Sequence, residues 1–112
     1  MDEVDWATPV EGGKWRSPRS LGLAFVFDNV AKSEAMVGTG PDPQALADQL
    51  SAAWLAFARS GNPNVPALPT WPAFKPSERA TMVFDVKSRV INDFRNDERT
   101  LLASVPVYRV NR

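Results

Sequence analysis

Two arginines beside a proline are the first residues here whose type and spacing indicate chemistry. Arg16 and Arg19 flank Pro18, and two guanidinium groups presented by a turn can bind an anion. Arginine side chains are mostly solvent-exposed in proteins, so a plain surface role explains the same pair more simply. We therefore expect a surface role and keep the anion site as the alternative.

Two groups of carboxylates lie close together in the sequence. They are Asp2, Glu3 and Asp5, and then Asp93, Asp97 and Glu98. Three acidic side chains can hold a hard cation such as Mg²⁺ or Ca²⁺, but acids are also favoured in the first turn of a helix. We expect a solvated segment and a helix cap rather than a metal site, and we predict no metal and no cofactor.

The sequence contains no histidine and no cysteine. The commonest general base at neutral pH is therefore missing, and Ser-His-Asp or Cys-His catalysis wholly inside this chain is excluded. No G-x-S-x-G motif occurs, and the glycines at 38–41 are not followed by the Gly-Lys-Ser/Thr of a phosphate loop. Composition and spacing alone thus indicate a mixed α/β domain without a visible active site.

Charge and hydropathy exclude several classes of partner. Thirteen basic residues balance thirteen acidic ones, so no basic stripe indicates a nucleic-acid partner. No apolar run approaches the length of a membrane span. The first residues are acidic, whereas a secretory signal starts basic and then turns apolar. The absence of cysteine favours a cytoplasmic location slightly.

A helix over 43–60 is the best-defined predicted element. Asp42 is a good N-cap, Pro43 suits the first helical position, and Gly61 is a natural C-terminal stop. One face carries apolar residues at helical spacing, and these are Leu46, Leu50, Ala53, Trp54, Phe57 and Ala58. We expect this face, aromatic residues included, to be part of the core.

Weaker patterns precede this helix. Alternating apolar residues within 1–10 predict a short strand, and Gly12-Gly13 predicts a turn. The apolar run at 21–27 is too short to distinguish a turn of helix from a buried strand. Residues 31–41 are small and polar and predict a loop.

In the segment after the helix, residues 61–79, prolines exclude a regular helix or a central strand. The span 61–79 predicts a coil held to the core by Trp71 and Phe74. A partner-binding proline motif is less favoured, because no P-x-x-P array with basic flanks occurs. Segments 81–84 and 89–91 predict a hairpin. Residues 96–104 predict a helix capped by Asn96 or Asp97, with three apolar residues facing inward. These three are Leu101, Leu102 and Val105.

Four segments resemble, in order, the C-terminal part of the type-B carboxylesterases, the group that includes para-nitrobenzyl esterases and cholinesterases. They are residues 6–14, 16–18 with 25–29, 53–64 running into 68–74, and 80–85. Together they span nearly the whole chain, and the helix that leads into Trp71-Pro72 is the most specific.

The resemblance implies that residues 1–112 are the C-terminal fragment of an α/β-hydrolase fold. It implies a late core strand at 1–7, a long helix that packs on the sheet, a β-hairpin and a short C-terminal helix. The family's serine nucleophile, acidic triad member and oxyanion-hole glycines lie in the N-terminal part of the parent domain. Without that part, we expect self-association through an exposed helix face or strand edge.

Arg19 occupies the position that matches the family's catalytic histidine, and Gly22 the usual acidic position. A guanidinium stays protonated and cannot act as a general base. We therefore expect no catalytic residue in this chain and no ester hydrolysis by the chain alone. The alternative is a non-catalytic interaction or scaffold module derived from the esterase fold.

Overall fold

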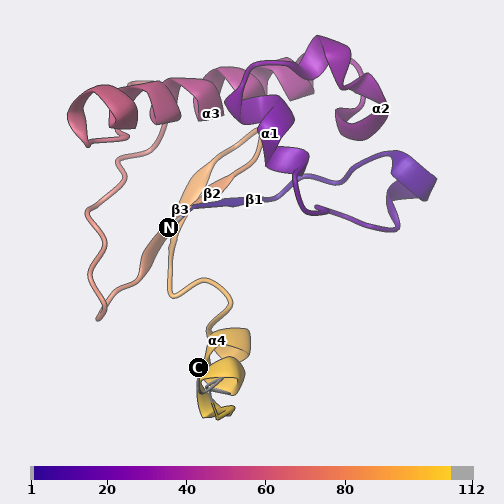
Figure 1. Ribbon diagram of the computed structural model, residues 1–112. Coiled ribbons are helices and arrows are strands. Elements are labelled where there is room, and N and C mark those ends of the chain that lie inside the picture. The colour runs from indigo at the N-terminus through magenta and orange to yellow at the C-terminus, as the bar shows by residue number, and fades with distance from the viewer. Residues whose placement is uncertain (1, 107–112) are drawn as a thin grey trace, which may run out of the picture.

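A three-stranded sheet lies at the centre of the computed structural model, which describes residues 2–106. The strands are β1 (Asp2–Val4), β2 (Ala80–Phe84) and β3 (Arg89–Asn92), in the order β1-β2-β3. β1 runs parallel to β2, and β2 runs antiparallel to β3. Helices fill the long crossover between β1 and β2, as a parallel pair of strands requires (Figure 1).

The central strand β2 is buried at all of its five residues. Its sequence Ala-Thr-Met-Val-Phe is almost continuously apolar, as expected of a strand covered on both faces. The predicted hairpin with β3 is confirmed: Met82 pairs with Val90, and residues 85–88 form the connection.

The first strand is shorter than predicted. Val4 lies opposite Phe84, the last residue of β2, so the ladder has no partner beyond it. The chain then leaves the sheet, and the Trp6 indole N–H donates to the Val37 carbonyl oxygen at 3.0 Å. The turn predicted at Gly12-Gly13 is confirmed as part of the 3₁₀ segment η1 (Val10–Gly13).

The undecided run at 21–27 is a helix, α1 (Leu21–Val26), which buries Leu21 and Phe25. The loop predicted for 31–41 is wrong, because the 3₁₀ segment η2 (Val30–Lys32) and the short helix α2 (Glu34–Val37) occupy it. Neither has a repeating pattern long enough to read from sequence. Burial of Val37 and its carbonyl contact with Trp6 hold α2 in place.

The long helix α3 (Pro41–Ser60) confirms the strongest prediction but begins two residues early. Pro41 and Pro43 both fit, because the first N–H groups of a helix have no intrahelical acceptor. Gly40 rather than Asp42 is therefore the N-cap. Gly61 ends the helix with φ 74°, as predicted, and its N–H bonds to the Phe57 carbonyl oxygen at 2.7 Å.

The core forms where α1 and α3 cover one face of the sheet (Figure 1). Its largest fully buried side chains include Phe25, Leu46, Leu50, Met82 and Phe84. The predicted packing of the long helix on the sheet is thus confirmed over its first three turns. Among the helices of residues 2–106, none combines the length and the apolar character of a membrane-spanning segment.

The helix α4 (Asn96–Ser104) confirms the last predicted element but lies apart from the other elements (Figure 1). The predicted inward residues are wrong: Leu101 is 67% exposed and Leu102 is 71% exposed, and Val105 is exposed too. The predicted cap is also wrong, since Arg95, in a left-handed conformation, precedes the helix. Nothing else in the described chain packs over this helix face.

Candidate functional site

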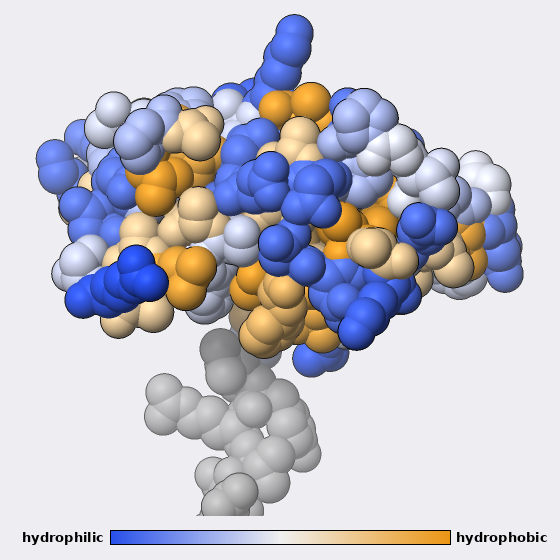
Figure 2. Space-filling view, turned by 90° about the horizontal axis from the view of Figure 1, so that it is seen from above, coloured by the Kyte–Doolittle hydropathy of each residue, from blue (hydrophilic) through white to orange (hydrophobic). Residues whose placement is uncertain are grey.

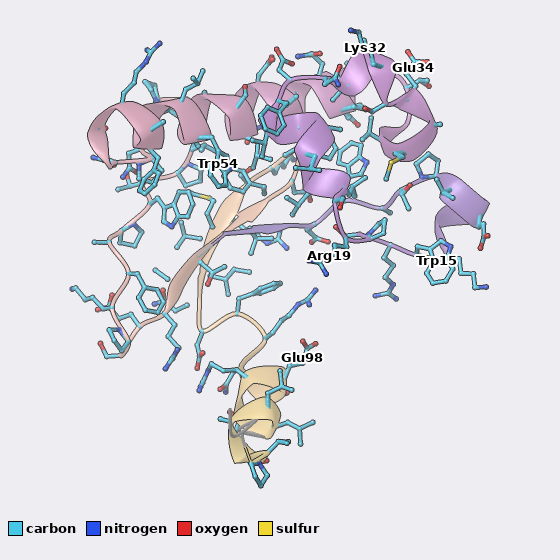
Figure 3. The ribbon with its side chains drawn as sticks, in the orientation of Figure 1. Trp15, Arg19, Lys32, Glu34, Trp54 and Glu98 are labelled. Carbon is cyan, nitrogen blue, oxygen red and sulfur yellow. The ribbon has the colours of Figure 1, made fainter. Side chains whose placement is uncertain are left out.

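The loop at 14–20 carries Arg19, the residue that the resemblance aligns with a catalytic histidine. It connects η1 to α1 below the long helix, and Figure 3 labels Trp15 and Arg19 on it. Two of its hydrogen bonds join it to residues 4–8 of the preceding chain. The Thr8 N–H donates to the Arg16 carbonyl oxygen at 2.8 Å, and the Ser17 hydroxyl donates to the Val4 carbonyl oxygen at 2.9 Å.

Arg19 itself is exposed, and within residues 2–106 its guanidinium has neither a hydrogen bond nor an ion pair. The same holds for the Arg16 guanidinium. The two cations are therefore available to solvent, and the anion site suggested by their spacing stays a prediction. A permanently protonated group at this position can hold a negative charge but cannot accept a proton.

The side chains of Asp2 and Glu3 lie outside the described ones, so the first acidic group stays a prediction. Among the described side chains, which begin at Val4 and end at residue 106, no group of three or more acidic residues could hold a metal ion. Asp93, predicted as part of a helix cap, instead accepts two hydrogen bonds from Arg99, at 2.7 and 2.8 Å. These hydrogen bonds hold the pKa of Asp93 below its usual value. Asp5 pairs with Arg89 at 3.1 Å.

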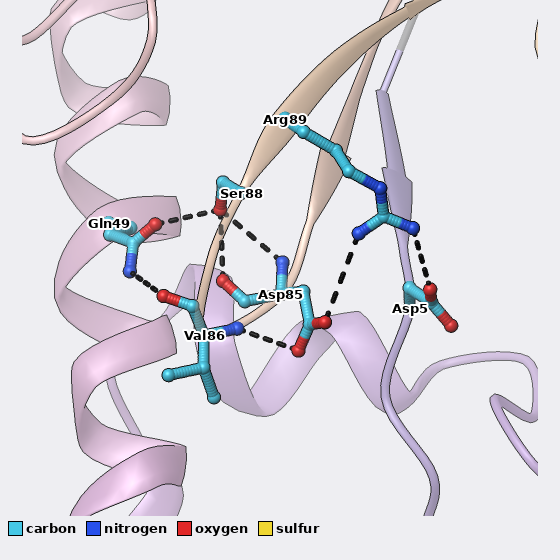
Figure 4. Close-up of polar contacts among 6 residues, drawn as sticks. All are labelled: Asp5, Gln49, Asp85, Val86, Ser88 and Arg89. Atoms are coloured by element: carbon cyan, nitrogen blue, oxygen red, sulfur yellow. Dashed lines mark hydrogen bonds and ion pairs between the residues drawn. The ribbon is translucent and has the colours of Figure 1, made fainter.

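A polar network joins the hairpin connection to α3 and to the chain after β1 (Figure 4). The Ser88 hydroxyl lies 2.7 Å from the Gln49 carbonyl Oε1, and the Gln49 amide donates to the Val86 carbonyl oxygen at 3.3 Å. The Arg89 guanidinium forms ion pairs with Asp5 at 3.1 Å and with Asp85 at 3.9 Å. The network is structural, because each of its polar groups already has a partner.

A groove of about 550 Å³ lies between the second half of α3 and the coil that follows it. We call it the aromatic groove. It is lined by Ala53, Trp54, Phe57, Gly61, Asn62, Pro63, Asn64, Trp71, Pro72, Ala73 and Phe74. None of these side chains is charged. In Figure 3, Trp54 lies on the side of α3 that faces the strands.

The groove corrects one prediction from the sequence. Trp54 is 48% exposed and Phe57 is 52% exposed, so these aromatics are not core residues in the described chain. The buried residues of α3 end at Ala53, and both aromatics lie beyond it in the helix. Phe74, predicted to hold the coil to the core, is also exposed, whereas Trp71 packs edge-on against Phe84 at 5.9 Å.

Asn64 holds two parts of the coil together, a role that was not predicted from the sequence. Its side-chain amide donates to the Trp71 carbonyl oxygen at 2.9 Å, and its side-chain oxygen accepts a hydrogen bond from the Trp71 N–H at 2.7 Å. The segment Asn62-Pro63-Asn64 could have predicted such a contact, since asparagine side chains commonly form hydrogen bonds with the backbone in turns. The surface seen from above, on the α3 side, differs from the uncharged aromatic groove. It carries many hydrophilic side chains with hydrophobic ones between them (Figure 2).

Comparison with curated relatives and solved structures places these features in a family. No family model matches the chain. The para-nitrobenzyl esterase of Bacillus subtilis is 32% identical over 104 residues, which cover 91% of this chain and 21% of that protein. The phenmedipham hydrolase of Pseudarthrobacter oxydans is 29% identical over 85 residues, 72% of this chain and 17% of that protein.

Solved structures of esterases are similar to this chain as well. A PNB esterase superposes on 96% of this chain with a TM-score of 0.80 and 28% identity. The carboxylesterase of Geobacillus stearothermophilus superposes on 89% with a TM-score of 0.73 and 37% identity. In each case the chain spans about one fifth of the relative's length.

Proposed function

Because the chain belongs to the type-B carboxylesterase family, we propose that residues 1–112 are the C-terminal part of a carboxylic-ester hydrolase domain and do not hydrolyse esters by themselves. In this proposal β1 is a late strand of the larger sheet, and α3 covers that sheet. The acyl-enzyme reaction of the family belongs to the complete domain. A non-catalytic interaction module derived from the same fold is the alternative.

One observation carries the proposed inactivity. The chain has no histidine, and the residue matching the family's base is Arg19, an exposed guanidinium on an anchored loop. In a serine esterase the imidazole takes the hydroxyl proton and returns it to the leaving group. Loss of that histidine lowers kcat by about 10⁶-fold in a comparable triad enzyme.

The surfaces of the described chain support the proposed partner, which is the N-terminal part of such a domain. Only one edge of β1 is paired, because the strand lies at the end of the sheet. The aromatic groove is uncharged and half-exposed, and α4 has no buried residue. Open edges and apolar surfaces of this kind normally have a covering partner.

A chimera tests the proposal. The N-terminal four fifths of the Bacillus subtilis esterase would be joined to this chain, with either Arg19 or Arg19→His. We expect hydrolysis of a p-nitrophenyl ester only in the Arg19→His chimera, and none by the isolated chain in either form. Turnover by the repurified isolated chain would overturn the proposed inactivity. A chimera that melts cooperatively yet stays inactive with Arg19→His would favour the interaction module.

A further inference from the structure

A single side-chain hydrogen bond ties the loop that carries Arg19 to the end of the first strand. The Ser17 hydroxyl donates to the Val4 carbonyl oxygen at 2.9 Å across 13 residues of sequence. Val4 is itself fixed, because it pairs with Phe84 in the sheet and the next N–H, that of Asp5, donates to the Phe84 carbonyl oxygen. We call the Ser17–Val4 hydrogen bond the Ser17 tether.

The chain around position 19 is held on both sides. Leu21 is 1% exposed, and its N–H donates to the Pro18 carbonyl oxygen at 3.2 Å. Two residues span at most about 7 Å, so residue 19 stays close to both the tether and the core. Arg16 (φ 51°) and Ser20 (φ 72°) bracket this stretch in the left-handed region, where backbone strain is maintained only by surrounding contacts.

We infer that Ser17 is a positioning residue for position 19, an inference that rests on the proposed function of the loop. The tether fixes the backbone from which residue 19 projects at the carboxyl end of β1. Ser17 acts through the backbone and touches no reacting atom. It would set the direction of a base at position 19 in the complete domain, and it sets the direction of Arg19 here.

The first test uses the chain itself and measures backbone order by ¹⁵N relaxation. We expect a backbone N–H order parameter of about 0.85 at residue 19 in the unaltered chain. In Ser17→Ala this order parameter should fall toward about 0.6. Ser17→Thr keeps the hydroxyl and should keep the order. Ser20→Ala is the matched control, because the Ser20 hydroxyl has no partner in the described chain. An unchanged order parameter in Ser17→Ala would overturn the tether.

The second test uses the Arg19→His chimera. Ser17→Ala should lower kcat about 100-fold with little change in KM, because a displacement of about 1 Å has that effect on catalysis. Ser17→Thr should restore kcat. Equal kcat in the Ser17→Ala and Ser20→Ala forms would overturn the positioning role. If every chimera is inactive while residue 19 still loses order in Ser17→Ala, the proposed function fails and the tether stands.

Discussion

Arg99 and Asp93 form a two-pronged ion pair at the base of α4. The Arg99 Nε and Nη2 atoms donate to the two oxygens of the Asp93 carboxylate, at 2.7 and 2.8 Å. Asp93 in turn is held by its N–H, which donates to the Glu78 and Arg79 carbonyl oxygens. No residue of α4 is buried, and among the described residues this pair joins the helix to the end of the hairpin.

Arg99→Gln should therefore detach α4 while leaving the sheet intact. We expect faster hydrogen exchange of the α4 amides and unchanged exchange in β2, measured by mass spectrometry. Glu98→Gln is the matched control, because Glu98 lies in the same helix and, among the described residues, forms an exposed pair with Arg95 at 3.7 Å and no other. Equal exchange of α4 in the two variants would contradict this role of the pair.

The same pair predicts a dependence on pH. Arg99 lowers the pKa of Asp93 from its ordinary value of 3.8, so the folded chain binds this proton more weakly than the unfolded chain. The contribution to stability is therefore complete above that ordinary value and is lost as the pH falls through the lowered one. Acid titration should detach α4 in the unaltered chain. In Asp93→Asn, exchange of α4 should already be fast at neutral pH and should change little on acidification.

Truncation of a buried side chain in the core over β2 should lower the free energy of unfolding. Leu50 is 1% exposed and belongs to the same cluster as Phe84, so Leu50→Ala should lower the free energy of unfolding by about 2–5 kcal/mol. Leu55→Ala is the matched control, since Leu55 lies on the same helix and is 56% exposed; its effect should stay within about 0.5 kcal/mol. Urea titration followed by circular dichroism measures both, and equal effects would contradict the assigned core.

Local sequence signals predicted much of this fold. Proline and glycine marked the two ends of α3, and β-rich segments around a polar connection marked the hairpin of β2 and β3. These features depend on residues close in sequence, whose preferences are the same in any fold. The short helix α2 has no such pattern and depends on tertiary contacts with Trp6.

Burial was harder to predict than secondary structure. Helical spacing indicates which residues share a face, but it does not say what covers that face. The faces carrying Trp54 and Leu101 were therefore predicted correctly as apolar and wrongly as buried. The candidate site shows the same limit: the resemblance identified position 19, whereas the contact between Ser17 and Val4 joins residues too far apart for local patterns.

Two glycines should respond oppositely to alanine. Gly61 has φ 74° at the end of α3, so Gly61→Ala should cost about 1–2 kcal/mol although no atom lies within 4 Å of the added Cβ. Gly22 lies within α1, where an added Cβ meets only Val4 Cγ2 at 3.7 Å. Gly22→Ala should therefore stabilise the chain by about 0.5–1 kcal/mol. Thermal melts measure both, and the same sign for the two variants would contradict the backbone argument.

The isolated chain should self-associate through the aromatic groove. Sedimentation velocity should show a weight-average mass that rises with concentration, because the groove presents half-exposed aromatic rings without charge. Trp54→Ser should reduce this association. Trp15→Ser is the matched control, since Trp15 is 56% exposed but lies on the loop before α1 and does not line the groove. A single species of monomer mass at every concentration would argue instead for an independently stable domain whose apolar surfaces need no partner.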